Sequence, residues 1–221
     1  MASTLLINKL ELLQFYDDPT DVEQGMNAAA VNAVAGEELG LALLIDYFRS
    51  VEVDAYIMPG PCSTGKRSGY RLDGWISTPE TVFQVEVKNW SAHSLGGKRL
   101  PVDASPEESS RHRIVVWNDY WTGETFREES AAKVLEPMLA PQGDKRITPL
   151  IAFWDPMHPR GLPEPLFHVP LVDSVFPEVT VFSMSSYLRG LKCANLQLPL
   201  PKTLARLTIL NRIFSDPLPW L

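Results

Sequence analysis

The feature that most constrains the fold is a pair of strand-like runs joined by a short turn, YRLDGWIS (70–77) and TVFQVEVKN (81–89). Both runs are rich in β-branched and aromatic residues. The Thr-Pro-Glu between them is typical of a turn. We therefore expect a β-hairpin in which Asp73, at the centre of the first run, lies near Glu86 in the second. Gly74 would allow a close backbone approach or a bend at this point.

The second run alternates between apolar and polar residues, and side chains alternate faces along a strand. Its apolar members should face the core: Phe83, Val85 and Val87. Glu86 and Lys88 then project together from the other face, about 7 Å apart at their α-carbons. A metal-assisted hydrolase needs such a pair, with a carboxylate for Mg²⁺ and a cation that positions water or steadies developing charge. An ion-pairing strand surface remains the alternative.

The surroundings of Asp73 favour the metal site. An Asp next to Leu72, Trp75 and Ile76 is out of place as ordinary strand surface. Two carboxylates brought close together repel each other unless a cation lies between them. Asp73 and Glu86 are therefore candidate metal ligands.

A third acidic group lies in AGEELG (35–40), within a helix expected over 27–50. Glu37 shares a helical face with apolar residues, so we expect it to point inward and reach the metal directly or through water. Glu38 shares its own face with Leu41 and Ile45. Which of the two acids serves the metal stays open, and a solvated acidic patch is the alternative.

The remaining pattern predicts one α/β domain. Residues 1–155 would form the core with an N-terminal helical segment, and 156–221 a C-terminal extension packed on it. We expect helices at 1–18, 124–140 and 183–191, strands at 51–58, 113–117, 148–154 and 179–182, and a final amphipathic helix. The apolar tail LTILNRIFSDPLPWL suits either core packing or a partner surface.

Charge and composition limit the function. The 221 residues carry a net charge of −7, which argues against nucleic-acid binding over the whole surface. Residues 60–114 nevertheless carry +2, which leaves −9 elsewhere. A phosphate-binding rim could use the basic residues of this stretch, with tryptophans as stacking platforms; a solvated loop is the alternative. No apolar run approaches the ~20 residues of a membrane span, no signal-peptide pattern is visible, and a cytoplasmic location is expected.

The order of these motifs resembles the PD-(D/E)xK nuclease superfamily. GEELGLALLIDYF, RLDGWI and VFQVEVKNW are most similar to the nuclease-related domain called NERD, over about residues 30–95. The resemblance implies a restriction-endonuclease-like αβββαβ core with a mixed central sheet flanked by helices. Leu72 departs from the pattern, because many members of the superfamily have Pro before the Asp.

The resemblance also implies roles for individual residues. Mg²⁺ or Mn²⁺ would be bound by Asp73, Glu86, the Val87 backbone carbonyl and Glu37, and Lys88 would orient or activate the hydrolytic water. The bond cut would be a phosphodiester, with DNA favoured over RNA. Candidate substrate contacts are Gln84, Asn89, Lys98, Arg99, Arg111 and Arg113. A homodimer or a partner protein subunit is compatible with the pattern, and a catalytically silent scaffold is the alternative function.

Overall fold

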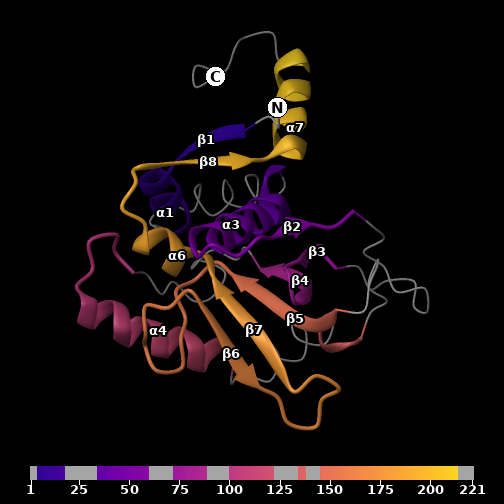
Figure 1. Ribbon diagram of the computed structural model, residues 1–221. Helices are drawn as coiled ribbons and strands as arrows, with labels where there is room; N and C mark the ends of the chain where they lie inside the picture. The colour runs from indigo at the N-terminus through magenta and orange to yellow at the C-terminus, as the bar shows by residue number, and fades with distance from the viewer. Residues whose placement is uncertain are drawn as a thin grey trace.

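The computed structural model describes residues 4–17, 34–59, 72–88, 100–121, 134–137 and 145–213. Within these ranges the chain is an α/β protein, with helices on both faces of a mixed six-stranded sheet (Figure 1). A separate antiparallel pair is formed by β1 (Thr4–Asn8) and β8 (Asn195–Pro199), and lies beyond one helical layer. The predicted α/β class and mixed sheet are confirmed.

The central sheet has the strand order β2-β3-β4-β5-β7-β6. Strand β4 pairs antiparallel with β3 and parallel with β5. Strand β7 pairs parallel with β5 and antiparallel with β6. The strands are β2 (Tyr56–Ile57), β3 (Gly74–Ser77), β4 (Thr81–Lys88), β5 (Arg146–Phe153), β6 (Leu166–Pro170) and β7 (Glu178–Ser183). Because β6 and β7 extend the same sheet, the described residues show no structural division at 155.

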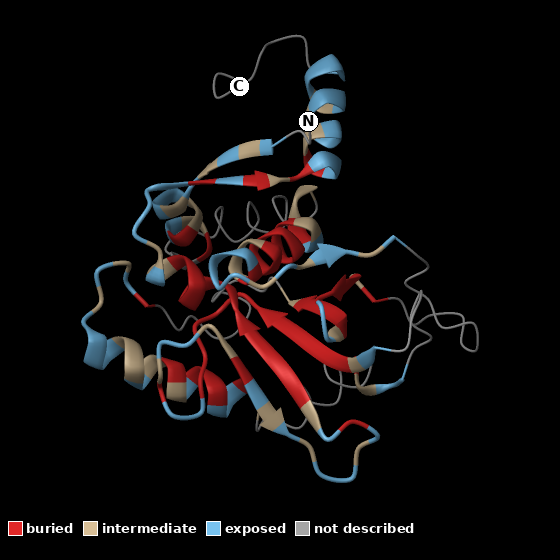
Figure 2. Cartoon of the chain, in the orientation of Figure 1, coloured by how far each residue is buried: buried red, intermediate tan, exposed pale blue. Residues whose placement is uncertain are grey.

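Two apolar cores lie on opposite faces of this sheet, and Figure 2 shows its strands as mostly buried. On one face α3 (Gly36–Ser50), α1 (Lys9–Asp17) and α6 (Met184–Gly190) pack against one set of strand side chains, which includes Val85. On the other, α4 (Pro106–Trp121) packs against the alternate set, which includes Ile151. A strand buried on both faces, as β4 is, normally consists almost entirely of apolar residues, so its polar residues stand out.

The predicted hairpin is confirmed, since Gly74 is opposite Val85 and Ser77 is opposite Val82. The turn is held by the Thr78 hydroxyl, which donates to the Thr81 carbonyl at 3.0 Å. Asp73, however, lies just before β3 and not at the centre of a strand. Its side chain bonds to the β4 backbone, which a residue inside the regular pairing could not do.

Among the described elements the chain order α3, β2, β3, β4, α4, β5 gives helix, three strands, helix, strand, with α4 preceding the helix expected at 124–140. Strands β5 and β7 and helix α6 occur close to their predicted positions. The final helix is α7 (Pro201–Ile213). Only 134–137 of the helix expected at 124–140 lies within the described residues.

Three expected elements differ. The N-terminal segment begins as strand β1, not as a helix, because it pairs with β8 far along the chain. Residues 113–117 belong to α4 and not to a strand. A capping box starts this helix: the Glu108 N–H donates to the Ser105 hydroxyl, and the Ser105 N–H donates to the Glu108 carboxylate. The strand expected over 51–58 is limited to Tyr56–Ile57.

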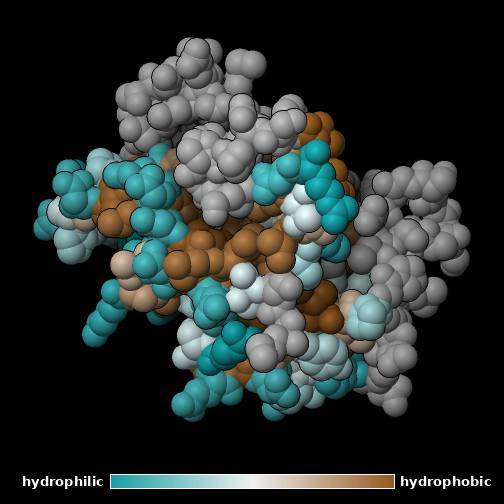
Figure 3. Space-filling model, turned by 90° about the horizontal axis from the view of Figure 1, so that it is seen from above, coloured by the Kyte–Doolittle hydropathy of each residue, from teal (hydrophilic) through white to brown (hydrophobic). Residues whose placement is uncertain are grey.

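Apolar side chains reach the surface at the end of the molecule where β1 and α7 lie (Figures 1 and 3). Leu6 is 74% exposed, and Ile209 and Ile213 of α7 are also exposed. The partner-surface interpretation of this helix therefore stays a prediction. Across the described ranges, no helix has both the length and the apolar character to cross a membrane.

Candidate metal centre at the β3–β4 hairpin

The candidate site lies where the parallel strands β4 and β5 end. Lys88, the last residue of β4, is paired with Phe153, the last residue of β5. The Trp154 N–H continues the ladder by donating to the Lys88 carbonyl at 3.0 Å. In α/β proteins ligands usually bind at the carboxyl ends of parallel strands, so this position suits a functional site.

Asp73 meets β4 from the neighbouring strand. Its Oδ2 accepts a hydrogen bond from the Val87 N–H at 2.6 Å. The pKa of Asp73 is raised to about 7, first by burial and then by the negative charges of Glu86 and Glu37, whereas the Val87 N–H and the Lys88 ammonium lower it. Burial, together with repulsion from the neighbouring acids, thus keeps Asp73 largely protonated below neutral pH.

Glu86 and Lys88 share a face, as predicted. Lys88 Nζ lies 2.5 Å from Glu86 Oε1, with the side chains 14% and 3% exposed. Hydrogen bonds between charged groups are short and strong, so this buried one holds the two side chains in a fixed relative position. Removing one partner would leave a buried charge, which is costly. The pair therefore fixes a carboxylate and an ammonium next to Asp73.

Two glycines allow helix α3 to lie close to these strands. A Cβ at Gly40 would lie 2.4 Å from a Val87 methyl carbon, and one at Gly74 would lie 3.0 Å from the Leu41 methyl carbons. The first distance is shorter than van der Waals packing permits, and the second would require Leu41 to shift by a few tenths of an ångström. The close approach brings the first turn of α3, with Glu37, to the edge of the site.

Glu37 and Glu38 have different surroundings. The Glu38 carboxylate accepts hydrogen bonds from the backbone N–H groups of Lys202 and Thr203 at 2.8 and 2.7 Å, which caps the start of α7. Glu37 is exposed, so the expectation that it points inward is wrong. Its position in the first helical turn, where solvent reaches it, explains the difference. Glu37 nevertheless acts electrostatically on Asp73, whereas Glu38 is engaged at the start of α7.

A divalent cation fits this donor set in part. Among the described residues, no group of three or more His, Cys, Asp or Glu side chains is arranged to hold a metal ion. Mg²⁺, however, typically uses one or two protein carboxylates and completes its shell with water and substrate phosphate. Asp73 and Glu86 supply two carboxylates whose mutual repulsion a cation would relieve.

The three predicted substrate contacts that the structure describes do not form one rim. Gln84 is fully buried, and its Nε2 donates to the backbone carbonyls of Val134 and, at 3.0 Å, Glu136. It therefore anchors the 134–137 segment, which corrects its expected role. Arg111 is exposed, whereas Arg113 is buried on another side of α4. The other three candidates lie outside the described residues: Asn89, Lys98 and Arg99.

Sequence reasoning missed a carboxylate at the same end of the sheet. Asp155 is 3% exposed and accepts a 2.5 Å hydrogen bond from the Tyr120 hydroxyl of α4. Burial, and then the adjacent Asp155 charge, raise the pKa of Tyr120. Because Asp155 follows Phe153 by two residues, it continues the strand face that carries Glu86 and Lys88. The signal was an acid immediately after an apolar strand, LIAFWD.

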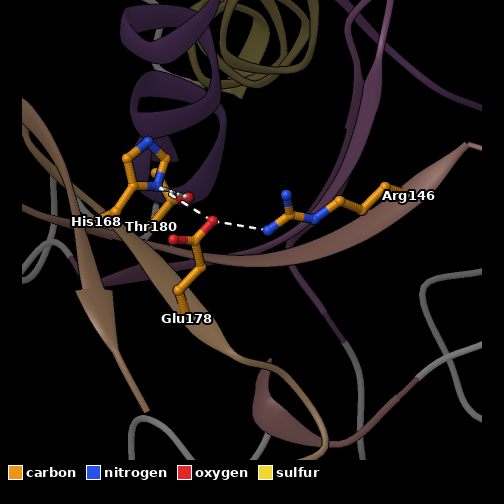
Figure 4. A network of polar contacts seen from close by, with 4 residues as sticks. All are labelled: Arg146, His168, Glu178 and Thr180. Atoms are coloured by element: carbon orange, nitrogen blue, oxygen red, sulfur yellow. Dashed lines mark hydrogen bonds and ion pairs between the residues drawn. The ribbon is translucent and has the colours of Figure 1, made fainter.

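A second charged cluster lies at the start of β5, at the opposite end of that strand from Phe153 (Figure 4). Arg146 pairs with Glu178 at 2.7 Å, and His168 Nδ1 lies 3.2 Å from the Thr180 hydroxyl. The Arg146 and Glu178 side chains are 58% and 33% exposed. Partly exposed ion pairs of this kind contribute little to stability. Substitutions in this cluster can therefore serve as controls for substitutions in the candidate site.

Comparison with known proteins gives no further assignment: no protein-family model matches the chain, and neither the curated proteins nor the solved structures include a match.

Proposed function

We propose that this protein is a Mg²⁺- or Mn²⁺-dependent nuclease that hydrolyses phosphodiester bonds, with DNA as the favoured substrate. The observation that carries the proposal is the arrangement of Asp73 beside the Glu86–Lys88 pair at the end of β4. The resemblance to the PD-(D/E)xK superfamily, with its restriction-endonuclease-like fold, supports the same function.

Each residue has a role that its surroundings favour. Asp73 and Glu86 would be the carboxylate ligands, with the Val87 carbonyl assisting and Glu37 adding negative charge at the rim. Lys88 would hold the attacking water or the non-bridging phosphate oxygen, because its ammonium is already fixed at 2.5 Å from Glu86. A bound Mg²⁺ would polarise the phosphate and lower the pKa of its water.

A second candidate function is a scaffold that keeps the fold without turnover. The direct Glu86–Lys88 ion pair favours it, because each group already satisfies part of the charge of the other. The two functions differ in one respect. A nuclease needs both residues for cleavage, whereas a scaffold needs them only for stability.

The test is a cleavage assay with Mg²⁺ and then Mn²⁺ on plasmid, linear duplex, single-stranded DNA and RNA. Lys88→Met is compared with Arg146→Met, which removes a cation at the other end of the sheet. We expect cleavage by the wild type and by Arg146→Met, and a loss of at least ~100-fold in Lys88→Met. Equal cleavage by both variants would remove Lys88 from the chemistry. Absence of cleavage on every substrate, in folded wild-type protein, would favour the scaffold.

A further inference from the structure

A cleft of about 650 Å³ lies between α1, α4, α6 and the 161–163 loop. Among the described residues that line it, three are basic and none is acidic. The basic residues are Lys9, Arg113 and Arg189. The volume lies within the range of small-molecule sites, about 300–1,000 Å³, and exceeds what a single inorganic ion needs.

Arg113 is the unusual member of this lining. It is only 7% exposed, and its Nε has no hydrogen-bond partner among the described residues. Burial, and then the positive charge of Arg189, lower the pKa of the Arg113 guanidinium. Buried charges in proteins are normally paired, so an anion in the cleft would stabilise this guanidinium.

The other polar groups of the cleft suit the same anion. The Ser186 hydroxyl is buried and, within the described chain, also has no hydrogen-bond partner. Arg189 donates to the Leu100 and Pro101 carbonyls, and Lys9 Nζ donates to the Leu191 carbonyl at 2.7 Å. These backbone carbonyls orient both cations at the cleft.

Apolar side chains and the loop that contains Gly161 also line the cleft. Leu10, Leu13, Val102 and Leu162 line it beside the cations. Gly161 has a φ of +69°, and a Cβ there would lie 2.3 Å from the Ser110 hydroxyl oxygen. The loop can therefore approach α4 closely only with glycine at this position. Cations and apolar side chains in the same cleft together suit a small phosphate ester.

We propose that this cleft binds the phosphate group of a small phosphate ester, such as a nucleoside monophosphate, through Arg113 and Ser186. The proposal is independent of the nuclease function, because it uses none of Asp73, Glu86 and Lys88. It assigns Arg113 to a small-molecule cleft and not to a nucleic-acid rim.

The test is calorimetric titration with inorganic phosphate, AMP and adenosine, at constant ionic strength and with EDTA present to exclude divalent metals. We expect AMP to bind at least ten times more tightly than inorganic phosphate, and adenosine not to bind. Arg113→Met should weaken AMP binding by roughly 10- to 100-fold. Arg111→Met, which removes an exposed guanidinium from the same helix, should bind AMP as the wild type does.

The stability of the variants provides a second readout. Arg113→Met should unfold at the same temperature as the ligand-free wild type or higher, because it removes a buried unpaired charge. If it fails to fold, Ser186→Ala replaces it. That variant deletes a hydroxyl without a described partner, and should weaken AMP binding about 3- to 10-fold. Equal binding of AMP by the wild type and the folded variants, or equal binding of AMP and adenosine, would overturn the proposal. Equal binding of inorganic phosphate and AMP would overturn the ester assignment.

Discussion

The carboxylate of Asp73 accepts a 2.6 Å hydrogen bond from the backbone N–H of Val87, the residue that separates Glu86 from Lys88. This bond joins the start of β3 to the strand that carries the candidate site. It also means that the protonation of Asp73 reports on the whole arrangement, because Glu86, Glu37 and Lys88 all act on its pKa.

The raised pKa of Asp73 predicts that ionisation of this residue destabilises the metal-free fold. Its pKa is about 7 in the folded protein, against 3.8 for an unperturbed aspartate such as that of the unfolded chain. Between these values the folded state binds more protons than the unfolded state, so stability falls as pH rises from about 4 to 7. Asp73→Asn keeps an acceptor for the Val87 N–H and removes the loss of stability that ionisation of Asp73 causes. With allowance for partial exposure, the variant should be more stable than the wild type by about 1–2 kcal/mol at pH 8.

Chemical denaturation in EDTA at pH 5 and pH 8 measures this effect. The stability difference between Asp73→Asn and the wild type should be larger at pH 8. A difference that does not change with pH would show that Asp73 has an ordinary pKa.

The pH profile of cleavage should have an acid limb set by Asp73. Ionised Asp73 is needed to bind a cation, so the rate at subsaturating Mg²⁺ should rise up to about tenfold per pH unit below pH ~7 and then level off. Glu37→Gln should move this limb to lower pH, because the charge of Glu37 raises the pKa of Asp73. Glu107→Gln, at an exposed position of α4, is the matched control. An identical shift in both variants would indicate a general charge effect.

The contact between Gly40 and Val87 predicts a sharp cost for a single methyl group. Gly40→Ala places a Cβ 2.4 Å from a Val87 methyl carbon and should destabilise the fold by about 1–3 kcal/mol. In Gly190→Ala the new Cβ meets no atom within 4 Å, so its stability should stay within about ±0.5 kcal/mol of the wild type. Urea denaturation of the two variants compares them directly, and equal stabilities would mean that α3 lies farther from β4.

Substitutions of Glu37 and Glu38, the two acids at the start of α3, should have different effects on hydrogen exchange in α7. Glu38→Ala removes the acceptor of the Lys202 and Thr203 N–H groups. We expect these amides to exchange faster, with a loss of about 1 kcal/mol in the stability of this helix end. Glu37→Ala should leave them protected. Faster exchange of these amides in the Glu37 variant would show that Glu37, and not Glu38, caps α7.

The hairpin could be predicted because the residues that determine it are close together in the sequence. The alternation in β4 and the Thr-Pro-Glu turn fix the register, and the register places Glu86, Lys88 and Asp73 together. The capping box at Ser105 and Glu108 was also visible in the sequence. The β-branched run RIVVW, which lies inside α4, by itself favours a strand.

The remaining features depend on contacts between distant residues. Strand β1 exists because it pairs with β8, and its own sequence also satisfies helical spacing. Glu38 caps a helix that begins 163 residues later, at Pro201, so the residues around it could not distinguish it from Glu37. Gln84 has an anchoring role only because the 134–137 segment packs over it.

The most direct test of the central claim is calorimetric titration of Mn²⁺ at pH 8 into the wild type, Asp73→Asn and Glu86→Gln. Glu178→Gln, which changes a carboxylate at the far end of the sheet, is the control. We predict one site in the wild type and in the control, and an affinity at least ten times weaker in each of the other two variants. Absence of binding to the wild type at millimolar Mn²⁺, or equal affinity in all four proteins, would contradict a metal centre at the β3–β4 hairpin.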